Sequence, residues 1–213
     1  MPIVTLQNPK GGAGKSTAAR IIARGLQLAG EEVRLVDADS QGTIRDWHAI
    51  REDHPTPILA MDTAEMMRQL GQHLPEDAWA IVDTAGRVEG MQAAAIRVSD
   101  LVVIPVQPSP DDVWAVYDLV EAVQSRQEIT DGLPQVAVLV SRMVKGTRLG
   151  REIDKAIEGL GLGRLDAILY QRQAIPRAFN EGKVPQETES EDSDVVAESR
   201  RLVRELLDWA GRS

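Results

Sequence analysis

The chain has 213 residues, of which 43% are hydrophobic, and its formal net charge is −9. This length suits one domain with a single core, and the negative charge argues against a uniformly basic nucleic-acid-binding protein. The chain contains no cysteine, which excludes disulfides, thiolate metal sites and a cysteine nucleophile and suits the reducing cytoplasm.

Short apolar runs alternate with helix-length segments along the chain. The runs predict strands at Ile3–Leu6, Val33–Val36, Ile58–Met61, Ala80–Val82, Leu101–Val106, Val136–Val140 and Leu165–Leu169. Helices are predicted at Ser16–Leu28, Asp111–Arg126, Arg148–Leu160 and, from an apolar stripe at helical spacing, between Val195 and Ala210. Because the strand runs lack polar alternation, we expect an α/β fold: one domain over 1–213, with a mostly parallel twisted sheet and helices on both faces.

Residues 10–17 read Lys-Gly-Gly-Ala-Gly-Lys-Ser-Thr, between the first predicted strand and the first predicted helix. Glycines let backbone N–H groups turn toward an anion, and a helix start favours negative charge. We expect Lys15 to contact the β- and γ-phosphates of a nucleotide and Ser16 to bind Mg²⁺. The residues expected to contact the phosphates are Gly11, Gly12, Ala13, Gly14, Lys15, Ser16 and Thr17. Pro9 replaces the first glycine of the common pattern, and a second lysine, Lys10, lies at the mouth of the loop.

Carboxylates follow two of the predicted strands. Asp37 and Asp39 come after the second strand, in Asp-Ala-Asp-Ser-Gln-Gly, and Asp83 follows Trp79–Val82. Ligands of a parallel α/β sheet bind beyond the carboxyl ends of its strands. We therefore expect the loop with Asp39 to order water and metal, and Asp83 to hold Mg²⁺, usually through water.

The nucleotide base is predicted less directly. The strand Val136–Val140 is followed by Ser141-Arg142-Met143, without the carboxylate that would recognise a guanine edge. We therefore favour adenine, with Arg142 and the 171–176 loop, beginning at Gln171, as the walls of its pocket.

These motifs resemble those of the ParA/MinD family of deviant Walker ATPases, over nearly the whole chain. Asn8-Pro9-Lys10, the segment 98–110 and Gln171-Arg172-Gln173 look most like the small ParF-like partition ATPases, with McdA-like positioning ATPases as a close relative. The resemblance implies a P-loop NTPase fold, a Mg²⁺-dependent ATPase and an ATP-dependent homodimer.

The resemblance also implies roles for single residues. Lys10 would reach the phosphates bound by the partner copy, Asp39 would orient the attacking water and Asp83 would support the metal. A small adaptor protein, ParB-like or McdB-like, would stimulate hydrolysis and connect the ATPase to its cargo. The family motif often has proline where Ser40 stands, which we expect to alter the stiffness of the loop and not its chemistry.

Three partner classes follow from the rest of the sequence. The residues expected to bind DNA non-specifically are Lys145, Arg148, Arg151, Lys155, Arg172 and Arg177; a nucleoid-associated, cytoplasmic protein would use them. The stripe at 195–210 packs on the sheet in one interpretation and docks on lipid, as in MinD, in the other. A metabolic enzyme with the same loop is a third class, and the lack of cysteine excludes its iron–sulfur form.

Overall fold

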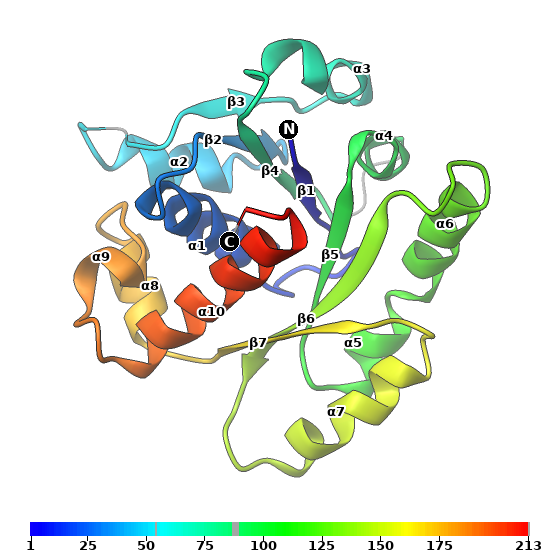
Figure 1. The fold of residues 1–213 in the computed structure, drawn as a ribbon. Helices are drawn as coiled ribbons and strands as arrows, with labels where there is room; N and C mark the ends of the chain where they lie inside the picture. Colours follow the sequence, from blue (N-terminus) through cyan, green and yellow to red (C-terminus); the bar gives the residue numbers. More distant parts are fainter. Residues whose placement is uncertain (54, 87–89, 213) are drawn as a thin grey trace.

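The computed structural model describes residues 1–53, 55–86 and 90–212 of the chain. Its strands form one parallel sheet in the order β3-β2-β4-β1-β5-β6-β7 (Figure 1). The strands are β1 (Ile3–Leu6), β2 (Val33–Ala38), β3 (Ile58–Ala60), β4 (Trp79–Thr84), β5 (Leu101–Val106), β6 (Gln135–Met143) and β7 (Arg164–Tyr170). The fold class expected from the apolar runs is confirmed.

Helices cover both faces of this sheet (Figure 1). They are α1 (Lys15–Leu28), α2 (Thr43–Ala49), α3 (Ala64–Arg68), the 3₁₀ helix η1 (Leu70–His73), α4 (Met91–Val98), α5 (Pro110–Trp114), α6 (Tyr117–Gln127), α7 (Arg148–Glu158), α8 (Ala174–Phe179), α9 (Pro185–Thr188) and α10 (Asp194–Trp209). Helices α1, α8 and α10 pack into the core on one face, whereas α4, α6 and α7 pack on the other. Burial of the sheet on both faces explains why its strands are apolar without alternation.

Helix α10 packs its apolar stripe against α1 and the sheet. Leu202, Val203 and Leu206 are buried in the same core as Leu26. A Cβ on Gly25 of α1 would lie 2.5 Å from Val203 Cγ2, so the two helices approach where no side chain intervenes. This confirms the packing interpretation of the stripe. Within the described ranges, no helix is both long and apolar enough to cross a bilayer.

Two predicted helices differ from the observed ones. The segment 111–126 is not one helix, because α5 ends at Trp114 and α6 begins at Tyr117. The intervening Val116, at φ −99° and ψ 0°, is fully buried in the core. The helix predicted at Arg148–Leu160 ends two residues earlier than expected, since α7 is Arg148–Glu158, and Lys145 lies before it. Gly146 precedes that helix at φ +79°, a conformation that α-helices of L-residues do not use.

Candidate nucleotide-binding site

The strand order brings the three sequence motifs together. Strand β4 lies between β2 and β1, so Asp83 is level with Asp37 on one side and with Leu6 on the other. The phosphate loop follows β1, and the loop with Asp39 follows β2. Asp83, the phosphate loop and the loop with Asp39 therefore lie at the same edge of the sheet, formed by the carboxyl ends of the strands, where ligands of parallel α/β folds bind.

The phosphate loop is held in shape by the end of β6. Ser141 Oγ donates to the carbonyl of Ala13 at 2.5 Å, and Arg142 Nη1 donates to the carbonyl of Gly12 at 3.1 Å. Gly14, just before α1, has φ +102°, and a Cβ there would lie 3.2 Å from Ser141 Oγ. Glycine at position 14 is thus required twice, by its dihedral angle and by this close approach.

Lys15 lies inside the loop and not in solvent. Its side chain is buried, and Nζ donates to the carbonyls of Asn8 at 3.0 Å and Lys10 at 3.4 Å. Burial lowers the pKa of Lys15, while the negative charges of Asp83 and Asp39 oppose the shift. An ammonium held only by carbonyl oxygens exchanges readily to an anionic ligand, because phosphate oxygens carry full charge.

Asp83 has the properties expected of a residue that supports a cation. It is 1% exposed, and neither carboxylate oxygen has a hydrogen-bond partner of standard geometry in the described structure. Burial raises the pKa of Asp83 to about 7, offset in part by the Ser16 hydroxyl and the Lys15 ammonium. A buried carboxylate beside a hydroxyl fits Mg²⁺, which takes one or two protein oxygens and completes its shell with phosphate and water.

The two carboxylates after β2 have different surroundings. Asp37 is fully buried and accepts hydrogen bonds from Arg45 Nε at 3.0 Å and from the backbone N–H of Asp39 at 3.1 Å. Asp39 is half-buried, and its Oδ1 accepts from the backbone N–H of Gln41 at 2.9 Å. Asp37 therefore shapes the loop, whereas Asp39 keeps a carboxylate that water can reach.

Lys10 forms an ion pair with α5. Its Nζ lies 2.7 Å from Asp112 Oδ2, and the Ser109 hydroxyl donates to the same oxygen at 2.7 Å. The Lys10 side chain is 39% exposed and that of Asp112 only 4%. That Lys10 reaches a partner copy stays a prediction.

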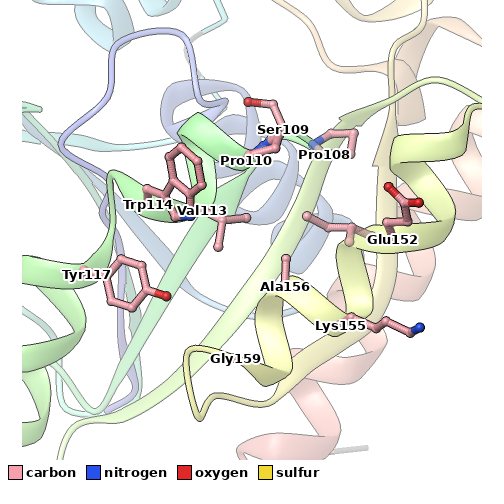
Figure 2. Close-up of a pocket in the computed structure, with 11 residues that line it drawn as sticks. Pro108, Ser109, Pro110, Val113, Trp114, Tyr117, Glu152, Lys155, Ala156 and Gly159 are labelled. Carbon is pink, nitrogen blue, oxygen red and sulfur yellow. The ribbon is translucent and has the colours of Figure 1, made fainter.

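A pocket of about 240 Å³ lies beyond Ser109, between α5, α6 and α7, and is lined in part by Trp114 and Tyr117 (Figure 2).

A cleft of about 650 Å³ joins the phosphate loop to the segment after β7. Its lining includes Gly12, Gly14, Lys15, Ser16, Thr17, Arg142, Gln171, Ile175, Pro176 and Phe179. The structure thus brings most of the expected nucleotide contacts to one cleft of a size typical for small-molecule sites. Arg142 differs from the expectation in one respect, since its guanidinium also braces the phosphate loop.

Among the side chains that the structure describes, the residues expected to bind DNA do not form one patch. Lys145 and Arg172 both pair with Asp194, at 3.0 and 2.9 Å, and Arg177 pairs with Glu189. Lys155 is exposed on α7, which covers the face of the sheet opposite to α8 and Arg177. The side chains of Arg148 and Arg151 lie outside the described residues.

Sequence reasoning missed several residues that shape the site. Ser141 and Gln107, whose Nε2 donates to the carbonyl of Gly12 at 3.0 Å, both hold the phosphate loop. Gln107 directly follows β5, so a search of every strand end for polar side chains finds it. Asp112 carries no such local signal, since its partner Lys10 comes from a separate part of the chain. Arg45 follows its partner Asp37 by eight residues, and only the turn of the intervening loop brings the two side chains together.

Fold and site together define a nucleotide-binding protein with a phosphate loop. The family model for the CobQ/CobB/MinD/ParA nucleotide binding domain matches residues 4–185, and the chain belongs to this family. Protein ParA of Rhizobium radiobacter is 29% identical over 133 residues, which cover 62% of this chain and 60% of that protein.

Solved structures share the fold at low sequence identity. An ATP complex of an McdA variant from Cyanothece superposes with a TM-score of 0.76 and 15% identity, covering 100% of this chain and 97% of that one. The septum site-determining protein MinD from Pyrococcus horikoshii, complexed with Mg-ADP, has a TM-score of 0.75 and 13% identity, covering 99% and 97%. These similarities establish the architecture of the chain.

Proposed function

We propose that the protein is a Mg²⁺-dependent ATPase that dimerises around ATP and positions or segregates a cargo through an adaptor protein. Its family membership and the ATP and Mg-ADP complexes of its structural relatives support ATP and Mg²⁺ as ligands. The observation that carries the proposal is the second lysine of the phosphate loop. Lys10 is partly exposed, and its ammonium pairs with Asp112 of α5 and not with the loop that carries it.

The residues of one protomer perform the first part of the reaction. Lys15 binds the β- and γ-phosphate oxygens, and Ser16 with Asp83 holds the metal; Mg²⁺, when bound, neutralises charge that develops on the phosphates. Asp39 accepts a hydrogen bond from the attacking water and orients it in line with the γ-phosphate. Phosphoryl transfer demands such positioning and charge stabilisation more than covalent chemistry by the protein.

Lys10 supplies the charge that a single protomer lacks. On dimerisation it exchanges Asp112 for the phosphates bound by the other copy, so each site is complete only in the pair. Hydrolysis removes the shared γ-phosphate, and the dimer separates. ATP therefore acts as a timer for dimer lifetime, because a ligand that binds only the associated state stabilises that state.

Non-specific DNA is the surface on which such dimers would act. On binding, phosphates of the DNA backbone replace the carboxylate of Asp194 as the partner of Lys145 and Arg172, and no contact with a base is needed. Two copies in one dimer double the number of contacts and raise avidity. We place the protein on the nucleoid, with a plasmid, a chromosome or a protein compartment as its cargo.

Sedimentation with ATP and Mg²⁺ tests the proposal. Wild type is expected to dimerise with ATP and not with ADP, and Lys10→Ala to bind ATP but remain a monomer. Lys183→Ala is the matched control, because that lysine pairs with Glu181 and is not among the residues that line the cleft. A Lys10→Ala protein that dimerises like wild type contradicts the role of this lysine. A steep decrease of ATP-dependent DNA binding with salt tests the electrostatic part.

A further inference from the structure

Arg20 is a buried cation that the mechanism above does not use. It lies on α1, one turn beyond Ser16, and is 7% exposed. It forms no ion pair within the described part of the chain, and its Nε is buried without a hydrogen-bond partner. Burying a guanidinium without a carboxylate partner costs several kcal/mol, so its position calls for an explanation beyond packing.

The contacts of Arg20 come from aromatic rings and one carbonyl. Its guanidinium carbon lies 4.5 Å from the centroid of the Phe179 ring and 5.7 Å from that of Trp47. Both distances are within the range of cation–π attraction. Nη2 lies 3.4 Å from the carbonyl oxygen of Thr43, to which it donates. Burial lowers the pKa of Arg20 to about 10, with Asp83 and Asp37 opposing the shift, so the side chain remains a cation at neutral pH.

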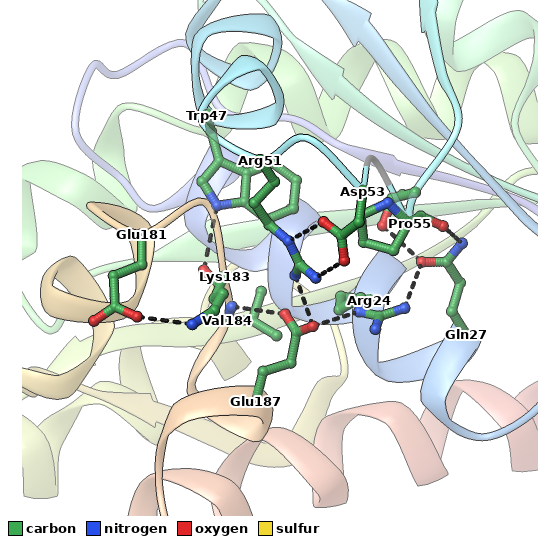
Figure 3. Close-up of polar contacts among 11 residues, drawn as sticks. Arg24, Gln27, Trp47, Arg51, Asp53, Pro55, Glu181, Lys183, Val184 and Glu187 are labelled. Atoms are coloured by element: carbon green, nitrogen blue, oxygen red, sulfur yellow. Dashed lines mark hydrogen bonds and ion pairs between the residues drawn. The ribbon is translucent and has the colours of Figure 1, made fainter.

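These partners belong to two different parts of the site. Phe179 lines the cleft together with Ile175 and Pro176, which belong to the same helix, α8. Thr43 begins α2 and directly follows the 39–42 loop that carries Asp39. The rings of Trp47 and Phe179 pack edge-to-face, with centroids 6.5 Å apart. Its indole N–H donates to the carbonyl of Lys183 at 3.2 Å (Figure 3).

We propose that Arg20 is a positioning residue that connects Phe179, in the wall of the cleft, to the loop carrying Asp39. A base in the cleft packs against Phe179 and restricts that ring. The ring in turn holds the guanidinium, and the guanidinium holds the Thr43 carbonyl at the start of α2. A bound base therefore changes the rate of hydrolysis, because it affects the position of Asp39, and does not change only the affinity for nucleotide. This inference rests on the ATPase function proposed above.

Hydrolysis of ATP and of inorganic tripolyphosphate separates this role from general stabilisation. Tripolyphosphate offers the phosphates to Lys15 and Ser16 but has no base to contact Phe179. In wild type, kcat is expected to be higher for ATP than for tripolyphosphate. Arg20→Met, which keeps the length of the side chain without charge or donors, is expected to lower kcat for ATP about tenfold, while kcat for tripolyphosphate changes less than about twofold.

Two further variants make the test specific. Phe179→Leu removes the ring but keeps an apolar side chain, and it is expected to reproduce the loss without touching Arg20. The double variant is expected to be no worse than either single one, since both break the same connection. Arg24→Met is the matched control on α1, because Arg24 pairs with Glu187 of α9 at 3.0 Å, away from the cleft (Figure 3); its kcat ratio is expected to equal that of wild type.

The outcomes distinguish the inference from the function beneath it. Equal loss of kcat for both substrates in Arg20→Met, or a change in KM alone, overturns the proposed role of Arg20. The proposed ATPase function is then unaffected. If Arg20→Met fails to fold by circular dichroism, Phe179→Leu decides, and an unchanged kcat ratio there overturns the proposal. Absence of any ATP hydrolysis by wild type, with and without DNA, overturns the proposed function and the inference together.

Discussion

Replacing Asp112 with asparagine is expected to strengthen ATP-dependent dimerisation. In the single protomer, Lys10 Nζ and Asp112 Oδ2 are 2.7 Å apart, and this ion pair must break before Lys10 reaches another copy. Asparagine keeps the size and polarity of the side chain but removes the charge that retains the lysine. The variant therefore lowers the free energy needed to release Lys10 from its contact in the monomer, and it does not change the phosphate loop.

The expected effect follows from the exposure of the pair. Lys10 is 39% exposed, so water screens the interaction, and a pair of this kind contributes about 1 kcal/mol. That free energy corresponds to about fivefold in an equilibrium constant for each lysine. Because two such pairs break in every dimer, the dimer dissociation constant is expected to decrease by between about fivefold and about 30-fold.

Sedimentation velocity over a concentration series, with a non-hydrolysable ATP analogue and Mg²⁺, measures this constant. Asp111→Asn is the matched control, because it makes the same change in net charge at the neighbouring exposed position. In a Lys10→Ala background, Asp112→Asn is expected to have no effect. The reasoning is refuted if Asp112→Asn dimerises no more strongly than Asp111→Asn.

Three further predictions concern the site itself. Lys15→Ala is expected to lose nucleotide binding by calorimetry, since no other buried cation lies within the described phosphate loop; wild-type affinity would contradict this. Asp39→Ala is expected to bind ATP and dimerise but to hydrolyse slowly, leaving a DNA-bound state in a retention assay, and unchanged turnover would remove Asp39 from the mechanism. Without ligands, the free energy of unfolding is expected to decrease from about pH 4 to about pH 7 as buried Asp83 ionises, by at most about 4 kcal/mol. The sign follows from a folded pKa above the unfolded one, and denaturant titrations should show a flatter pH dependence in Asp83→Asn than in wild type.

The alternation of apolar runs and helical segments was enough to predict the sheet. Strands β1, β4 and β5, in the middle of the sheet, are buried along their whole length, so their sequences are continuous apolar runs, whereas the edge strands β3 and β7 are only partly buried. Strands β2 and β4 nevertheless extend beyond the apolar runs to include Asp37 and Asp83. Charged residues do not signal a strand by themselves, and these two are placed in it by pairing with a neighbouring strand.

The sequence by itself determined the phosphate loop, the loop with Asp39 and the carboxylate Asp83, because these depend on glycine spacing and on strand ends that are local in the chain. Only the tertiary structure decided that Lys10 pairs with Asp112, that Arg142 braces Gly12, and that Arg20 lies between Phe179 and Thr43. The partners in these contacts come from separate elements, and the order of strands in the sheet sets which of them meet. The order of the strands follows from how the elements pack, and it cannot be inferred from the spacing of residues within a single motif.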